Sequence, residues 1–164
     1  MRDRMRLMLV TVGGLGLIRR APGTWGSIPP AALALALMLG GAHDKWLFIV
    51  LLALLVVSSA LCVALTPWAE RRFGRSDPRA IVLDEVAGQC LALLPVALIG
   101  TESAAAAIIT ALVAFALFRL FDITKPGLID TAQRLPHGWG VLTDDLFAGA
   151  AAGGLLWVGL KLAA

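Results

Sequence analysis

Tyrosine is absent from the 164-residue chain, cysteine occurs only twice, and charged residues make up no more than 15% of it. Cys62 and Cys90 lie in apolar stretches without a C-x-x-C spacing, which is typical of small buried hydrophobic residues. The 14 basic residues form no long run, which argues against nucleic-acid binding. β-Branched residues alternate nowhere, which argues against a barrel. Residues 1–10 lack a long apolar core, so a cleaved signal peptide is not expected.

Apolar residues are abundant instead: they make up 59% of the chain, and the mean hydropathy of +0.86 is typical of a membrane protein. Segment 47–67 has no charged residue and is bracketed by Trp46 and Trp68. As a helix, at about 1.5 Å per residue, it would cover roughly the 30 Å hydrocarbon core with a tryptophan at each interface. Further apolar segments predict helices over 28–41, 86–99, 104–117 and 146–160.

The sequence therefore predicts an all-α membrane protein with four to five apolar helices, forming a single domain over residues 1–164. With five crossings, only Lys45 and Lys161 of the 14 basic residues fall on the side opposite the N-terminus. The positive-inside rule then places the N-terminus in the cytoplasm of a multi-pass protein. Whether 28–41 crosses the bilayer completely stays open.

Acidic residues are scarce, yet most of the 11 gather in short patches that flank the apolar segments. The patches are Asp84-Glu85, Asp122 with Asp130, and Asp144-Asp145, with Asp77 just upstream of the first. Adjacent acids beside apolar runs repel each other and are costly to bury, so they are tolerated best where a cation neutralises them. All patches fall on the expected cytoplasmic face, where we predict a metal site and catalytic loops at the membrane surface.

Each patch also has a simpler explanation. Asp84-Glu85 opens a predicted helix, where the helix dipole favours an acid, although it explains two adjacent acids less well. One residue of Asp144-Asp145 could be the N-cap of the last helix. Asp122 ends a helix, where the dipole disfavours an acid. Arg119 and Lys125 lie one turn to either side of it, as a local ion-pair cluster or as phosphate-binding groups.

Two further segments could contact a phosphate. Residues 21–27, A-P-G-T-W-G-S, precede the first apolar helix, and their glycines and hydroxyls could form an anion cradle. A turn followed by an N-cap explains the same residues, and the ending of a Walker A loop is missing. His137 lies in H-G-W-G and could be a general acid or base, could hold a phosphate when protonated, or could be a loop histidine without a role. Oxygen ligands without a Cys/His cluster favour Mg²⁺ over Zn²⁺.

The motifs P-G-T-W-G-S, V-L-D-E-V-A-G-Q, F-R-L-F-D-I-T-K-P-G-L-I-D and H-G-W-G-V-L-T-D-D-L-F-A-G follow in this order over roughly 13–154. Together they resemble the phosphatidylglycerophosphatase A family, from which the chain departs at Gly127. The resemblance implies a phosphoric monoester hydrolase of the bacterial inner membrane. It would remove the terminal phosphate of phosphatidylglycerophosphate with Mg²⁺, leaving phosphatidylglycerol.

The resemblance and the acidic patches together give a candidate site. The expected Mg²⁺ ligands are Asp84, Glu85, Asp122, Asp144 and Asp145, which with Lys125 and His137 form the catalytic set. The expected phosphate-binding residues are Thr24, Gly26, Ser27, Arg119 and Lys125. The attacking group, water or a carboxylate, stays open.

Two rival functions have different signatures. A cation-binding transport protein should carry its acids in mid-span, whereas here they lie at the ends of the apolar segments. A non-enzymatic membrane scaffold could use the acids as helix caps, but that leaves Asp122 unexplained. The expected partner of the enzyme is a phospholipid substrate in the membrane, and the sequence indicates no oligomeric state.

Overall fold

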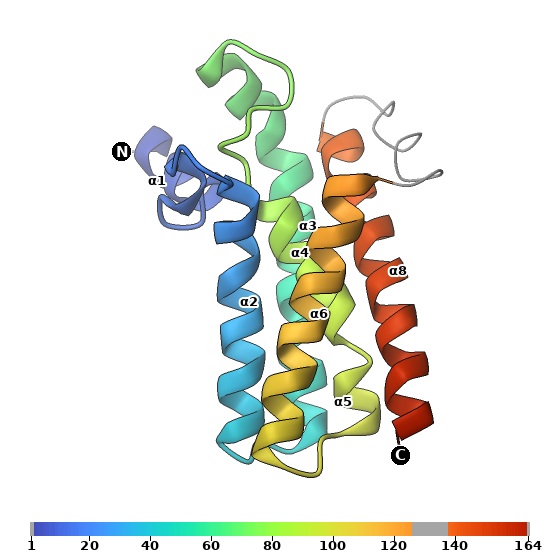
Figure 1. The fold of residues 1–164 in the computed structure, drawn as a ribbon. Helices are drawn as coiled ribbons and strands as arrows, with labels where there is room; N and C mark the ends of the chain where they lie inside the picture. Colours follow the sequence, from blue (N-terminus) through green and yellow to red (C-terminus); the bar gives the residue numbers. More distant parts are fainter. Residues whose placement is uncertain (1, 126–137, 164) are drawn as a thin grey trace.

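The computed structural model describes residues 2–125 and 138–163, and this part of the chain is helical and contains no strand (Figure 1). The predicted all-α fold is confirmed for these residues. The elements are α1 (Arg2–Val10), the 3₁₀ turn η1 (Leu15–Leu17), α2 (Pro22–Leu39), α3 (Asp44–Phe73), α4 (Leu83–Leu93), α5 (Val96–Ile99), α6 (Ala104–Thr124) and α8 (Gly138–Ala163).

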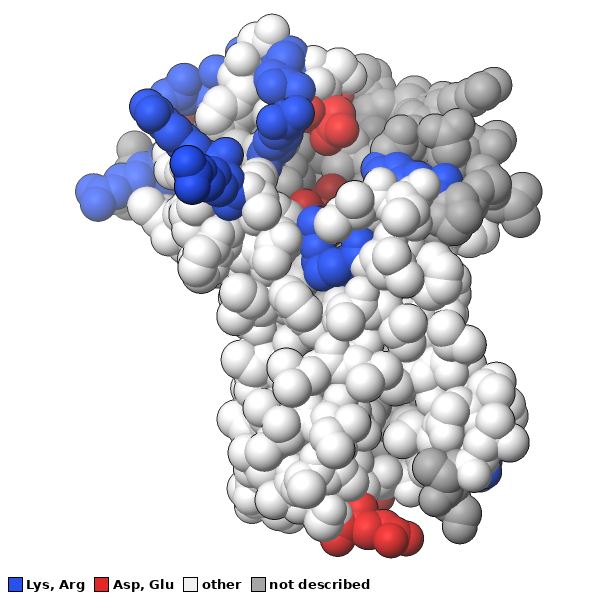
Figure 2. Space-filling view, viewed as in Figure 1, with Lys and Arg blue, Asp and Glu red and all other residues white. Residues whose placement is uncertain are grey.

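The chain direction brings five helix termini together at one end of the bundle, the upper end in Figure 1. Helices α2, α4 and α8 begin there, and α3 and α6 finish there. This end, called the polar end below, also carries α1 and the 74–82 linker between α3 and α4. Lys and Arg gather at it, whereas most of the surface below is uncharged (Figure 2).

Helix α4 lies in the centre of the bundle, packed against α2, α3, α6 and α8. Nine of its 11 residues are buried, as expected for a helix that other helices enclose on several sides. The sequence predicted one helix over 86–99, but α4 finishes at Leu93 and a separate turn, α5, follows Pro95. Proline has no N–H to continue the helical hydrogen bonds, which accounts for the break.

In the described part of the chain, three helices are long and apolar enough to cross a membrane: α3, α6 and residues Gly138–Leu162 of α8. Large apolar side chains such as Val56, Ile109 and Leu112 point outward from the bundle, each at least 58% exposed. Such a surface is stable against lipid and unfavourable in water. The structure thus supports a membrane protein, while the count of four to five membrane helices stays a prediction.

Two helices begin earlier than the sequence indicated. α2 begins at Pro22 instead of near residue 28, so Pro29 and Pro30 lie inside it and not in its first turn. α8 begins at Gly138, which places Asp144 and Asp145 in its second turn. The interpretation of one of these acids as an N-cap is therefore wrong. Hydropathy missed both starts because polar and glycine-rich residues form these first turns.

The contact between α4 and α8 is close enough to require glycine. A Cβ atom at Gly149 would lie 2.3 Å from the carbonyl oxygen of Gly88, whereas a Cβ at Gly154 on the same helix would meet nothing within 4 Å. We expect Gly149→Ala to destabilise the fold by about 2 kcal/mol through overpacking. Gly154→Ala should be neutral or stabilise by up to about 1 kcal/mol, because alanine has the higher helix propensity.

Thermal unfolding in detergent, followed by circular dichroism, measures this difference. The unfolding temperature of Gly149→Ala should fall clearly below that of wild type, and that of Gly154→Ala should not. Equal unfolding temperatures for the two variants would contradict the close helix contact.

Candidate active site at the polar end

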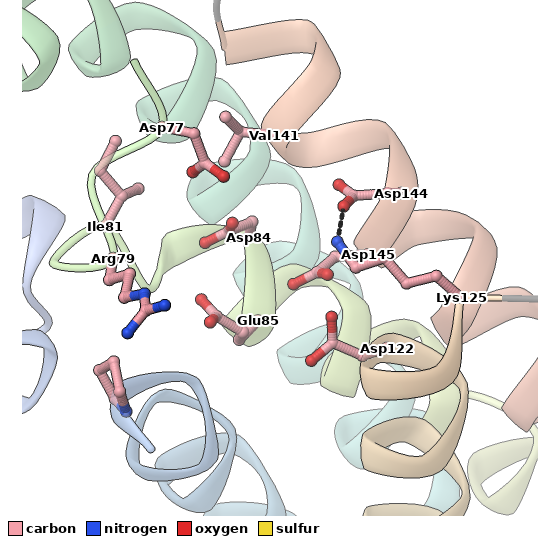
Figure 3. Close-up of a pocket in the computed structure, with 11 residues that line it drawn as sticks. Asp77, Arg79, Ile81, Asp84, Glu85, Asp122, Lys125, Val141, Asp144 and Asp145 are labelled. Carbon is pink, nitrogen blue, oxygen red and sulfur yellow. Dashed lines mark hydrogen bonds and ion pairs between the residues drawn. The ribbon is translucent and has the colours of Figure 1, made fainter. Parts of the chain in front are cut away.

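A cavity of about 140 Å³ opens at the polar end, between the N-termini of α2, α4 and α8, the last turn of α6 and the 74–82 linker (Figure 3). Its lining residues include six carboxylic acids and two basic side chains. They are Pro22, Asp77, Arg79, Ile81, Asp84, Glu85, Asp122, Lys125, Val141, Asp144 and Asp145. More than half of the chain's 11 acidic residues thus face one small cavity.

Three of these acids form a tighter group. One carboxylate oxygen from each of Asp84, Glu85 and Asp145 lies within 4.8 Å of the other two. In each of these residues one buried oxygen has no hydrogen-bond partner: Asp84 Oδ1, Glu85 Oε2 and Asp145 Oδ2. Leaving a buried carboxylate without a partner costs several kcal/mol, and a divalent cation would remove that cost. An all-oxygen set of this kind fits Mg²⁺.

The raised pKa values of Asp84 and Glu85 also indicate that this cluster of acids lacks a compensating positive charge. Burial raises the pKa of Asp84 well above its ordinary value, and the charge of Glu85 raises it further. Burial, followed by the charge of Asp145, raises the pKa of Glu85 to about 8. Without a cation, Glu85 therefore retains its proton at neutral pH, and Asp84 is harder to ionise than an exposed aspartate. A bound cation favours the ionised form and would displace the protons.

The other two predicted metal ligands line the same cavity but are engaged by basic side chains. Arg119 Nη1 lies 2.6 Å from Asp122 Oδ2, and Lys125 Nζ lies 2.5 Å from Asp144 Oδ2. The ion-pair cluster predicted around Asp122 is thus present. Lys125 lines the cavity itself, whereas Arg119 lies outside the lining and pairs with Asp122, which lines it. The five predicted acids come together, and the geometry divides them into a group of three and two ion pairs.

The segment predicted as an anion cradle, 21–27, is not a separate loop ahead of the first apolar helix, because residues 22–27 form the first turns of α2. Ser27 is fully buried, and its hydroxyl donates to the carbonyl of Gly23 at 2.9 Å. Gly26 packs against Val82, where an added Cβ would lie 2.7 Å from the Val82 Cβ. Neither residue lines the cavity, and Thr24 lines a separate groove.

What the start of α2 does provide is a close approach to the acids. A Cβ at Gly23 would lie 2.2 Å from Glu85 Oε1 and 3.0 Å from Arg119 Nη1, so a larger residue here would displace the Glu85 carboxylate. The Glu85 carboxylate therefore lies against the first turn of α2, where free N–H groups and the helix dipole favour negative charge. The P-G-T-W-G-S motif thus positions a carboxylate instead of forming a phosphate loop.

Sequence reasoning missed the contribution of the 74–82 linker. Arg79 points into the cavity, and Asp77 faces it from the rim (Figure 3). Among the described residues no ion pair involves Arg79, so its guanidinium group is available to a ligand. The sequence placed Asp77 just upstream of the first acidic patch, but it gave Arg79 no role. The Asp77-Pro78 pair, a turn signal between charged residues, was the one local hint.

Backbone strain is concentrated around the cavity. Four described residues other than glycine have positive φ angles: Val12, Ala21, Asp77 and Lys125. Asp77 and Lys125 line the cavity, and Ala21 precedes the lining residue Pro22. Such conformations cost about 1 kcal/mol or more and tend to occur at functional sites. His137 and Asp130, the remaining predicted residues, lie outside the described part of the chain.

Comparison with known proteins connects this cavity with a phosphatase family. The family model described as Phosphatidylglycerophosphatase A matches residues 8–160, a range that includes every residue lining the cavity. A Phosphatidylglycerophosphatase A from Haemophilus influenzae is 35% identical over 143 residues, which cover 85% of this chain and 80% of that protein. A Bacteroides thetaiotaomicron protein with the name "Putative phosphatidylinositol-3-phosphatase" is 32% identical over 149 residues, covering 87% and 86%. No solved structure matches significantly.

Proposed function

The chain belongs to the phosphatidylglycerophosphatase A family, and on that premise we propose that it hydrolyses the terminal phosphate of phosphatidylglycerophosphate in a reaction that depends on Mg²⁺. The products are phosphatidylglycerol and inorganic phosphate, which makes the protein a lipid phosphatase of phospholipid biosynthesis. The observation that carries the proposal is the group of Asp84, Glu85 and Asp145, three converging carboxylates that each have one buried oxygen without a hydrogen-bond partner, within a family of phosphatases.

The residues that line the cavity would have three different roles. Asp84, Glu85 and Asp145 would hold Mg²⁺, which when bound supplies positive charge to the phosphate oxygens and lowers the pKa of a coordinated water. Arg79 and Lys125, on opposite sides of the acids, would bind the phosphate oxygens. Asp144 positions the Lys125 ammonium group through their ion pair.

Arg119 does not line the cavity and would influence the phosphate only indirectly. It pairs with Asp122 and lies behind Glu85, and it thereby balances the negative charge of two acids from outside the cavity lining. His137 remains a candidate for protonating the leaving oxygen.

The position of the site suits a substrate held in a bilayer. The cavity lies at the polar end, where three helices long enough to cross a membrane begin or finish. A phospholipid headgroup would reach it without leaving the interface. A transport pathway would instead need acids along the middle of the spans, and these acids lie at one end. We place the polar end and the N-terminus on the cytoplasmic side because the described arginines gather there.

The names of the two relatives define the sharpest test of substrate. Purified protein in detergent micelles is supplied with phosphatidylglycerophosphate or phosphatidylinositol 3-phosphate, each with Mg²⁺ or with EDTA, and phosphate release is measured. We expect release from phosphatidylglycerophosphate at least about tenfold faster, and only with Mg²⁺. Faster release from phosphatidylinositol 3-phosphate would mean that the inositol lipid is the preferred substrate. No phosphate release from either lipid by folded protein would favour a non-enzymatic scaffold.

A further inference from the structure

An apolar groove of about 340 Å³ runs between α2 and α6 and is distinct from the acidic cavity. The two helices contact each other and stand side by side on the face shown in Figure 1. Its lining includes Thr24, Ile28, Ala32, Leu35, Ala111 and Phe115. Thr24 is the only polar residue in the lining, and it lies at the end of the groove nearest the polar end.

The groove begins where the acidic cavity stops. Thr24 follows Gly23, where an added Cβ would meet the side chains of Glu85 and Arg119. On α6, Phe115 lies one turn before Arg119, and residues four apart share a helix face. The Arg119 guanidinium group thus lies at the junction, with the ion pair to Asp122 on one side and the apolar groove on the other.

The length of the groove matches one leaflet of a bilayer. Thr24 and Leu35 are 11 residues apart on α2, which at about 1.5 Å per residue is roughly 16 Å along the helix axis. Half of the hydrocarbon core is about 15 Å. The hollow exists because alanines occupy positions on both facing helices, Ala31 and Ala32 on α2 and Ala111 on α6, where larger side chains would close it.

We propose that this groove binds one acyl chain of the phospholipid substrate while its phosphate occupies the acidic cavity. The inference rests on the proposed function and adds a specificity site to it. The polar junction, the leaflet-length apolar hollow and the uncharged surface around it fit a lipid whose headgroup is bound at the polar end (Figure 2).

The groove contributes positioning more than affinity. An acyl chain leaves an equally apolar bilayer to enter it, so little hydrophobic free energy is gained. A chain held along α2 and α6 instead fixes the angle and depth at which the headgroup enters the cavity. Correct orientation of a bound substrate is worth orders of magnitude in rate, and a modest misplacement costs part of it.

Ala32→Phe tests the groove because it fills the hollow from an exposed position without disturbing the core. Ala36→Phe is the matched control, at a second exposed alanine of α2 that lies outside the groove. Phosphate release is measured with a dioleoyl substrate and with a dihexanoyl substrate of the same headgroup. For Ala32→Phe, the ratio of long-chain to short-chain kcat/KM should fall about tenfold, whereas for Ala36→Phe it should equal the wild-type ratio.

A second readout does not depend on turnover. A phosphatidylglycerol probe with a photoreactive diazirine on its acyl chain should cross-link to α2 and α6 residues of the groove, and Ala32→Phe should reduce that labelling. Equal ratios for the two variants, or labelling spread evenly over α3 and α8, would contradict acyl-chain binding in the groove. Neither result would contradict the proposed phosphatase activity. Wild-type protein that releases no phosphate from either substrate would instead overturn the proposed function, and with it this inference.

Discussion

Asp84→Asn is expected to lower Mg²⁺-dependent phosphate release by roughly 1,000-fold, because the amide offers the cation a neutral oxygen in place of a charged one. Asp84 is buried, belongs to the group of three converging carboxylates, and has an oxygen without any hydrogen-bond partner. The side chain keeps its size, so packing is preserved. The measurement is kcat/KM with phosphatidylglycerophosphate in mixed micelles at saturating Mg²⁺.

The same substitution separates a metal ligand from a structural residue. Without Mg²⁺, Asp84→Asn should unfold at the wild-type temperature or above it, because it removes a buried, repelled acid. Added Mg²⁺ should stabilise wild type and leave the variant unchanged. Asp3→Asn serves as control, since Asp3 lies at the polar end with its side chain 76% exposed and outside the cavity. Lost activity together with lost metal-free stability would assign Asp84 a structural role instead.

Arg79→Gln is expected to lower kcat/KM by about 100-fold, the order found when a charged donor to a reacting phosphate or oxyanion is removed. Arg79 points into the cavity, and no ion pair among the described residues occupies it. Its loss should therefore leave folding unchanged and remove a phosphate contact. Inorganic phosphate, as a competitive inhibitor, should bind the variant correspondingly less tightly.

Two further variants sharpen this prediction. Arg72→Gln removes an exposed arginine from the last turn of α3, outside the cavity, and should change kcat/KM less than about threefold. Arg79→Lys should recover only part of the activity, because an ammonium group does not bind phosphate in the bidentate way a guanidinium group does. If Arg72→Gln and Arg79→Gln lowered kcat/KM equally, Arg79 would contribute only to the general surface charge and would not be a specific phosphate ligand.

The helical class and the gathering of the acidic patches could be predicted from the sequence, because both predictions depend on local properties. Apolar composition without strand periodicity indicated helices, and adjacent acids beside apolar runs indicated a site. The structure brings Asp84, Asp122 and Asp145 from three helices into one cavity, as the patches suggested. A requirement for charge compensation can be read from a single segment, even when the compensating group lies elsewhere in the chain.

Other features depend on contacts between distant segments and left weaker signals. The 86–99 segment looked like a membrane span, yet α4 is buried among other helices, and hydropathy does not distinguish burial in protein from burial in lipid. The glycines at 23 and 26 suggested a phosphate loop, but they allow α2 to approach Glu85 and Val82. Arg79 was indistinguishable from its basic neighbours until the linker was placed over the cavity.

The most direct test of the central claim, that the acids at the polar end hold a divalent cation, is Mn²⁺ binding followed by electron paramagnetic resonance. Mn²⁺ prefers the same oxygen ligands as Mg²⁺, and its free signal disappears on binding. The account predicts saturable binding to wild type, competition by Mg²⁺, and loss of that binding in Asp84→Asn and Asp145→Asn. Undiminished Mn²⁺ binding by both variants, or full phosphatase activity in EDTA, would contradict it.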